Sequence, residues 1–176
     1  MATTYEAIAT VTVGSGGASS IDFTSIPATY TDLFLHVSAR SNRAAQLDYW
    51  NLRFNNNSGT NYSARWLKAY GVNVLESSSN SGADKMFIGW VNGNTATSNT
   101  FASTSIYIPN YAGSANKSVS SDGATENNAS GNNDFELGII AGLWSSSSAI
   151  NQVTLLPAVG TLLQYSTATL YGIKNS

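Results

Sequence analysis

A single histidine and ten carboxylates are the first residues to consider for acid–base chemistry in this sequence. His36 lies in the run Leu33-Phe-Leu-His-Val37, where apolar residues occupy every second position. A histidine can serve as a general base or as a member of a nucleophilic triad. No G-x-S-x-G elbow or other nucleophile signature accompanies it. The pattern therefore favours a strand histidine that hydrogen-bonds to a neighbour over a catalytic one.

The carboxylates show no recognisable pairing. A glycosidase needs two of them facing each other across a cleft, and the spacing marks out no such pair. Asp122, Glu126 and Asp134 flank one Asn-rich loop and could supply oxygen ligands to Ca²⁺. The D-x-[DN]-x-[DN]-G loop is absent, so a solvated loop is the favoured interpretation of this segment.

Cofactor and metal chemistry have little support in the sequence. The chain has no Cys and one His, which excludes thiolate nucleophiles, disulfides and a multi-histidine metal site within one chain. The segment Gly14-Ser-Gly-Gly lacks the spacing of a phosphate-binding loop and predicts a hairpin turn. We therefore expect no metal, no cofactor and no enzymatic activity.

Aromatic residues are the most distinctive candidates for binding. Tyr62, Trp66 and Tyr70 share one face of an alternating segment with the charged Lys68, which predicts a half-exposed aromatic stripe. Three roles stay open for it: a protein interface, core packing, and stacking on sugars. We favour the interface. The candidate interface residues are Tyr62, Trp66, Tyr70, Trp90, Tyr111 and Trp144.

The elements that position these residues are predicted to be strands, because short runs of period two alternate with Ser/Asn/Gly clusters. About ten short strands in one domain predict an all-β, antiparallel two-sheet β-sandwich that is jelly-roll-like. Leu33–Ala39 is nearly continuously apolar, which predicts a central strand buried on both faces. Ser77–Gly82 and Asp122–Asn133 are predicted loops. The predicted strands are Tyr5–Val13, Ile21–Phe23, Leu33–Ala39, Tyr49–Phe54, Tyr62–Tyr70, Met86–Val91, Phe101–Ile108, Ser114–Ser121, Phe135–Trp144, Ile150–Leu156 and Tyr165–Ile173.

Length and composition set the class of protein. The 176 residues are expected to form one domain (1–176), and residues 1–6 are either an N-terminal arm or the start of the first strand. Hydrophobic residues make up 42%, charged residues only 10%, and the formal net charge is −2. Scattered basic residues argue against a nucleic-acid partner, and no apolar run is long enough for a membrane span. The N-terminus lacks the pattern of a secretory signal.

The low charge also bears on assembly. Soluble monomers usually guard sheet edges with Lys or inward-pointing charges, and this chain has only four Lys. The final strand, Tyr165–Ile173, carries no charge, so its edge is expected to be covered by the chain's own first strand or by another subunit. A neutral hydroxyl- and amide-rich surface also lets copies crowd together without repulsion. Both points favour a symmetric homo-oligomer.

Several stretches resemble one protein family. They are Ile21-Asp-Phe-Thr-Ser-Ile-Pro-Ala-Thr-Tyr-Thr-Asp-Leu33, Leu52-Arg-Phe-Asn-Asn-Asn-Ser-Gly-Thr-Asn-Tyr-Ser63, Ile106-Tyr-Ile-Pro-Asn-Tyr111 with Lys117, and the close with Leu143-Trp144, Ala149-Ile150 and Ala168-Thr-Leu-Tyr-Gly-Ile173. The series resembles small structural proteins of tailed bacteriophages, including phages of aquatic bacteria and cyanobacteria. It spans nearly the whole chain in order, and it carries no active-site residues.

The resemblance implies a β-sandwich component of the virion, on the capsid surface or in the tail. The first expectation is a decoration or cement protein that binds the head lattice, with the major capsid protein as partner. It is assembled in the host cytoplasm as a homo-oligomer, and shell symmetry favours a trimer. The alternative is a tail-associated or fibre-like module that recognises host-surface glycan through exposed Trp and Tyr. Neither role needs nucleic acid or a membrane as partner.

Overall fold

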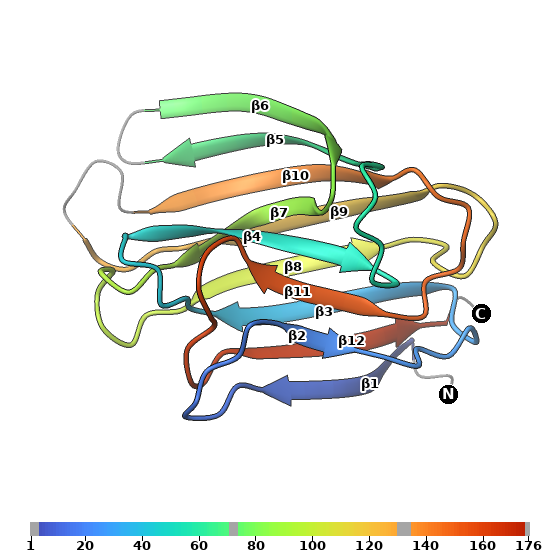
Figure 1. Cartoon of the computed structure of the whole chain (residues 1–176), viewed down its shortest axis with the longest axis horizontal. Coiled ribbons are helices and arrows are strands. Elements are labelled where there is room, and N and C mark those ends of the chain that lie inside the picture. Colours follow the sequence, from blue (N-terminus) through green and yellow to red (C-terminus); the bar gives the residue numbers. More distant parts are fainter. Residues whose placement is uncertain (1–3, 71–73, 130–134, 175–176) are drawn as a thin grey trace.

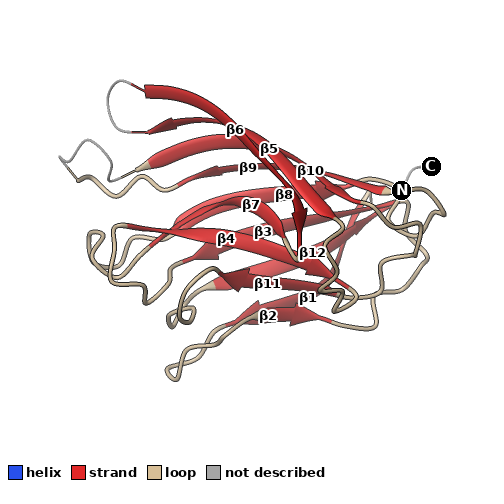
Figure 2. Cartoon of the chain, turned by 45° about the horizontal axis from the view of Figure 1, so that its top comes forward, coloured by secondary structure: helices blue, strands red, loops and turns tan. Residues whose placement is uncertain are grey.

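The chain forms two antiparallel β-sheets packed face to face in a computed structural model that describes residues 4–70, 74–129 and 135–174 (Figures 1 and 2). The large sheet has eight strands in the order β1 (Tyr5–Thr12), β12 (Thr167–Ile173), β3 (Asp32–Ala39), β8 (Ala102–Ile108), β9 (Lys117–Ala124), β10 (Glu136–Trp144), β5 (Tyr62–Tyr70) and β6 (Val74–Ala83). The small sheet has four, in the order β2 (Ile21–Phe23), β11 (Val153–Pro157), β4 (Leu47–Phe54) and β7 (Met86–Asn92). Helices are absent from the described ranges, so these hold none that could cross a membrane.

The predicted all-β fold is confirmed as a two-sheet, jelly-roll-like antiparallel sandwich. Each strand of the small sheet follows and precedes a strand of the large one, so the chain passes repeatedly between the layers. The described residues hold twelve strands, somewhat more than expected. Most predicted strands occur within a few residues of their expected bounds, because alternating apolar residues bury one face of each strand in a shared core.

Two predicted loops are wrong in part. Ser77–Gly82 belongs to β6, where Ser77 pairs with Leu67 and Ser79 with Arg65 of β5. Asp122 lies in β9 and pairs with Ile139 of β10. Serine and glycine have low strand propensity, but the ladder to a neighbouring strand overrides it. Hydrogen bonding to β5 and β10 therefore makes both segments strands.

The strand β3 is central, as predicted, but it is not buried on both faces. Leu33, Leu35 and Val37 are fully buried in the core, whereas His36 on the opposite face is exposed. The small sheet covers only one side of the large sheet (Figure 2), so the face of β3 that carries His36 has no second sheet over it. Local hydrophobicity alone does not reveal this asymmetry.

The first strand covers the final strand, as one of the two predicted alternatives stated. β1 pairs with β12 along its length, with a bulge between Ala7 and Ala9. Tyr5 and Glu6 lie within β1, so the N-terminal arm is wrong for them; residues 1–3 lie outside the described residues. The edges of the large sheet are therefore β1 and β6.

The sheets differ in width, and this difference leaves part of the inner face of the large sheet uncovered. β7 is the edge strand of the small sheet and packs mainly against β10 and β9, with fewer contacts to β5, so β6 and part of β5 extend beyond it (Figure 1). The inner faces of β5 and β6 consequently line an open groove. The outer face of the whole large sheet is not covered by the small sheet at all (Figure 2).

Candidate functional site

Four of the six candidate interface residues are core residues, and the interface prediction is wrong for them. Tyr62, Trp90, Tyr111 and Trp144 are all at least nine-tenths buried. The Trp144 ring stacks on the Tyr62 ring with centroids 6.1 Å apart. The Tyr62 hydroxyl donates to the Asn57 carbonyl at 3.2 Å, and the Tyr111 hydroxyl donates to a backbone carbonyl. Their polar tips are satisfied inside the fold, as buried tyrosines require.

The other two candidates, Trp66 and Tyr70, are half-buried on the inner face of β5. The predicted aromatic residues therefore do share one face of β5. Because that face points toward the small sheet, Tyr62 at one end is buried in the core. Only the other end, beyond β7, reaches the surface.

A cluster of exposed aliphatic side chains on the outer face of β5, β6 and β10 was missed by sequence reasoning. We call it the aliphatic patch; its members are Leu67, Leu75, Leu137, Ile139 and Leu143. Ile139 pairs across the strands with Leu67, and Ala69 lies between Leu137 and Leu75. Leu75, Leu137 and Ile139 are 73%, 62% and 60% exposed. Contiguous apolar surface of this kind usually marks an interaction site.

The edge next to the aliphatic patch is only lightly guarded. From Leu75 to Asn80, β6 holds no Lys, Arg or Pro, and its one charged residue is Glu76, which lies on the inner face beside Lys68. A shallow hollow of about 290 Å³ between Leu67 and Ile139 roughens the surface. Together the patch and the edge can exclude water from a protein partner and supply backbone hydrogen bonds.

The outer face shows no catalytic arrangement among the described residues. His36 has Thr169 and Ser105 as its cross-strand neighbours, and no carboxylate of the described segments forms an ion pair with it. Likewise, the described ranges contain no group of three potential metal-ligating His, Asp or Glu side chains. Asp134, one of the three carboxylates considered for Ca²⁺, lies outside the described residues.

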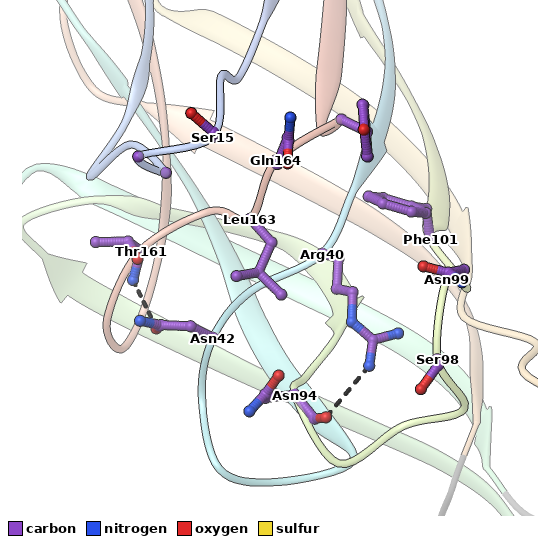
Figure 3. Close-up of a pocket in the computed structure, with 13 residues that line it drawn as sticks. Ser15, Arg40, Asn42, Asn94, Ser98, Asn99, Phe101, Thr161, Leu163 and Gln164 are labelled. Carbon is purple, nitrogen blue, oxygen red and sulfur yellow. Dashed lines mark hydrogen bonds between the residues drawn. The ribbon is translucent and has the colours of Figure 1, made fainter.

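A polar pocket of about 530 Å³ lies at one end of the sandwich, where four loops meet (Figure 3). Arg40 lines it but is 5% exposed. Its Nη1 donates to the carbonyls of Thr97 and Thr100 at 2.7 and 2.9 Å, and its Nη2 donates to those of Ala96 and Asn94 at 2.8 and 3.3 Å. Burial lowers the pKa of the Arg40 guanidinium. This guanidinium therefore anchors the β7–β8 loop and is not a free charge for a ligand.

Arg40→Lys is expected to lower the free energy of unfolding by about 2–4 kcal/mol, because one ammonium cannot reach the carbonyls that both guanidinium nitrogens satisfy. Urea denaturation measures the change. Arg65→Lys, at an exposed position on β5, serves as the matched control and should shift the midpoint very little. Equal midpoints for the two variants would show that Arg40 does not anchor the loop.

The groove beneath β5 and β6 combines aromatic, charged and amide side chains in one uncovered site. We call it the inner groove; it has a volume of about 380 Å³ and is lined by Tyr49, Asn51, Trp66, Lys68, Glu76, Asn80, Lys85, Phe87, Trp90 and Ala158. Lys68 Nζ lies 3.2 Å from Glu136 Oε1 and 3.6 Å from Glu76 Oε2. The same ammonium lies 4.2 Å from the ring centroid of Tyr70 and 5.4 Å from that of Trp90. Lys68 thus links the carboxylates to the aromatic rings.

Glu136 is a buried carboxylate whose second oxygen, Oε2, has no hydrogen-bond partner in the described structure. Burial raises the pKa of Glu136, and the hydrogen bond and charge of Lys68 only partly oppose this rise. Glu76 raises the same pKa further by charge repulsion. Glu136, which contacts the groove residue Lys68, is therefore a carboxyl group whose ionised form is less favoured than that of a free carboxyl group.

The raised pKa of Glu136 makes a pH-dependent contribution to stability. When the folded-state pKa exceeds the unfolded-state value of about 4.3, the contribution is complete below that value and is lost as pH rises through the folded-state pKa. Glu136→Gln removes the titration. The stability of the variant relative to wild type should therefore increase as pH is raised from about 4 to neutral. Thermal melts at a series of pH values check this, and a pH-independent difference would contradict it.

Comparison with known proteins yields little similarity. No protein-family model matches the sequence, and no curated protein matches it. Among solved structures, the chain is similar to Caenorhabditis elegans galectin LEC-6, with 8% identity, a TM-score of 0.35, and coverage of 94% of this chain and 96% of that one. It is also similar to infectious bursal disease virus, Gx strain, with 11% identity, a TM-score of 0.12, and coverage of 97% and 41%. At TM-scores this low, neither similarity supports an inference about function.

Proposed function

We propose that this protein is a structural component of a tailed-bacteriophage virion, of the decoration or cement type, and that the aliphatic patch docks it onto the head lattice. The observation that carries the proposal is the patch itself: five large aliphatic side chains exposed on one face beside the edge strand β6, which holds a single charged residue between Leu75 and Asn80. The sequence resemblance to small phage structural proteins supplies the context. In this role the protein binds its neighbours and carries out no chemical reaction.

The energetics of the aliphatic patch fit a docking surface. Fully burying one Leu or Ile side chain contributes about 1.5–3 kcal/mol, and several of these side chains are more than half exposed in the free chain. Few charged groups surround them, so little desolvation opposes contact with an apolar partner surface. Arg65 and Asp122 are the charged residues nearest the patch in the strand register. The major capsid protein is the proposed partner.

A cement role also fits the composition of the surface. A decoration protein bridges neighbouring capsomers, and many copies lie close together on the shell. With 10% charged residues and a net charge of −2, copies repel one another little. A homo-oligomer, with a trimer favoured at positions of threefold symmetry, engages several lattice sites at once. Weak individual contacts then add up through effective concentration.

The proposal is tested by returning purified protein to capsids from which it has been stripped. We expect rebinding at a fixed copy number per capsid and a rise in the melting temperature of the shell. Sedimentation measures the first and calorimetry the second. If the protein neither rebinds nor stabilises the shell, the decoration role is wrong.

A further inference from the structure

The inner groove has a floor of packed aromatic rings. Phe87 lies at its centre, with ring centroids 4.9 Å from Trp66, 4.8 Å from Trp90 and 6.0 Å from Tyr49, all edge-to-face. Phe87 and Trp90 are buried, Trp66 is half-buried, and Tyr49 is 51% exposed. The exposure of the rings therefore increases from the core to the open mouth of the groove, whereas the rings of a closed core would all be buried.

The positions of these rings are fixed by close packing between the sheets. Gly138 of β10 faces Trp90, and a Cβ atom at this glycine would lie 2.6 Å from Trp90 Cζ3. The absence of a side chain lets the indole lie directly against β10. Because β7 is buried along its whole length, Phe87 and Trp90 have little freedom to move. A site that is already ordered loses less entropy when a ligand binds.

Polar groups of both kinds surround the aromatic floor. Lys68 and Lys85 supply ammonium donors, and Glu76 supplies carboxylate acceptors. The Asn80 Oδ1 atom accepts from the Ala64 amide at 2.9 Å. Asn51 is 6% exposed, lines the groove, and its Nδ2 has no hydrogen-bond partner in the part of the chain described. A buried amide without a partner is unfavourable and is best explained by a ligand or water that supplies one.

The balance of charges restricts the ligand. The ammonium groups of Lys68 and Lys85 and the guanidinium of Arg53 are matched by the carboxylates of Glu76, Glu136 and Asp84. Asp84 pairs with both Lys85, at 3.1 Å, and Arg53, at 2.6 Å. A phosphate or other anion would meet these carboxylates, and a purely apolar ligand would leave buried charges and the Asn51 amide without partners. A neutral molecule with apolar faces and many hydroxyl groups fits both the aromatic floor and the paired donors and acceptors of this lining.

We infer that the inner groove binds a neutral saccharide, whose apolar ring face lies on Tyr49 and Trp66 while its hydroxyl groups exchange hydrogen bonds with Asn51, Lys68 and Glu76. The volume of about 380 Å³ falls in the range of small-molecule sites. The inference goes beyond the proposed docking role, because the groove and the aliphatic patch lie on opposite faces of β5 and β6. It therefore holds for a protein on the head or in the tail.

The full-length protein is titrated with cellobiose, maltose and lactose, and binding is followed by tryptophan fluorescence and by amide chemical shifts. We expect saturable binding of at least one of the three, with shifts confined to β4, β5, β6 and β7. Tyr49→Ala is expected to weaken binding at least tenfold, and Trp66→Ala, which removes a half-buried ring, by more. Asn51→Asp preserves size but removes the amide donor, and is also expected to weaken binding at least tenfold.

Tyr165→Ala is the matched control, because this 66% exposed tyrosine lies on the β11–β12 loop, away from the groove. It should leave saccharide binding unchanged. Failure of all three sugars to bind saturably would overturn the inference, as would binding that Tyr49→Ala and Asn51→Asp leave unaltered. Rebinding of these two variants to capsids is measured in parallel. Loss of sugar binding with intact rebinding separates the groove from the docking role.

Discussion

Replacing Leu137 with Asp and Ile139 with Lys should abolish rebinding to stripped capsids while leaving the fold intact. Both side chains are about 60% exposed on the outer face of β10, so the change removes little core packing. In the docked state the new charges would be buried against an apolar surface, which costs several kcal/mol. We expect the affinity to fall at least about a hundredfold, equivalent to about 2.7 kcal/mol.

The choice of charges protects the fold of this double variant. Ile139 pairs with Asp122 of β9, so a lysine there faces an opposite charge and not a like one. Val159→Asp is the control, because Val159 is 51% exposed on the loop before β12 and lies outside the aliphatic patch. Co-sedimentation with capsids measures binding. Undiminished rebinding of the double variant would exclude the patch as the docking surface.

Trp144→Ala should lower the free energy of unfolding by about 3–5 kcal/mol, the usual cost of removing a fully buried large aromatic side chain. Trp144 is 2% exposed at the end of β10. Its ring lies 6.1 Å from that of Tyr62 and 5.4 Å from that of Phe54, so the substitution opens a cavity between β10, β5 and β4. Chemical denaturation followed by fluorescence of the remaining tryptophans measures the loss.

Truncation of an exposed aromatic residue provides the comparison. Tyr165→Ala should change the free energy of unfolding by no more than about 0.5 kcal/mol, as is usual for surface substitutions. A loss below about 1 kcal/mol for Trp144→Ala would mean that the tryptophan is less tightly packed than its contacts indicate. It would also reopen Trp144 as an interface residue.

The sheet architecture could be predicted because period-two alternation is a local property of the sequence. In β8, Ala102, Ile106 and Ile108 are buried in the core, whereas Ser103 and Tyr107 on the other face are exposed, and the alternation is clear in the sequence. The absence of charge on the final strand likewise indicated a covered edge, and β1 covers it. Such features depend only on neighbours in sequence or on a single partner strand.

The exposure of individual side chains in the large sheet could not be predicted, because it depends on which of its faces the small sheet covers and on how far the narrower small sheet reaches. Trp66 and Trp144 share the inner face of the large sheet. Trp144 is buried because the small sheet lies over it, whereas Trp66 is half-buried because it lies at the edge of β7, where the small sheet ends. β10 is apolar on both faces, and in isolation this is the pattern of a strand covered on both sides. The signal that could have revealed the aliphatic patch is the mismatch between that pattern and two Ser-rich strands of the same sheet, β9 beside β10 and the edge strand β6 beyond β5.

The most direct test of the proposed role is electron cryomicroscopy of the intact phage particle that carries this protein. We expect density for the sandwich on the outer surface of the head at a fixed position in each lattice unit. The outer face of β5, β6 and β10 should lie against the major capsid protein, with Leu137 and Ile139 buried in the contact. Absence of the protein from the head, or a head-bound copy with this face turned to solvent, would contradict the account.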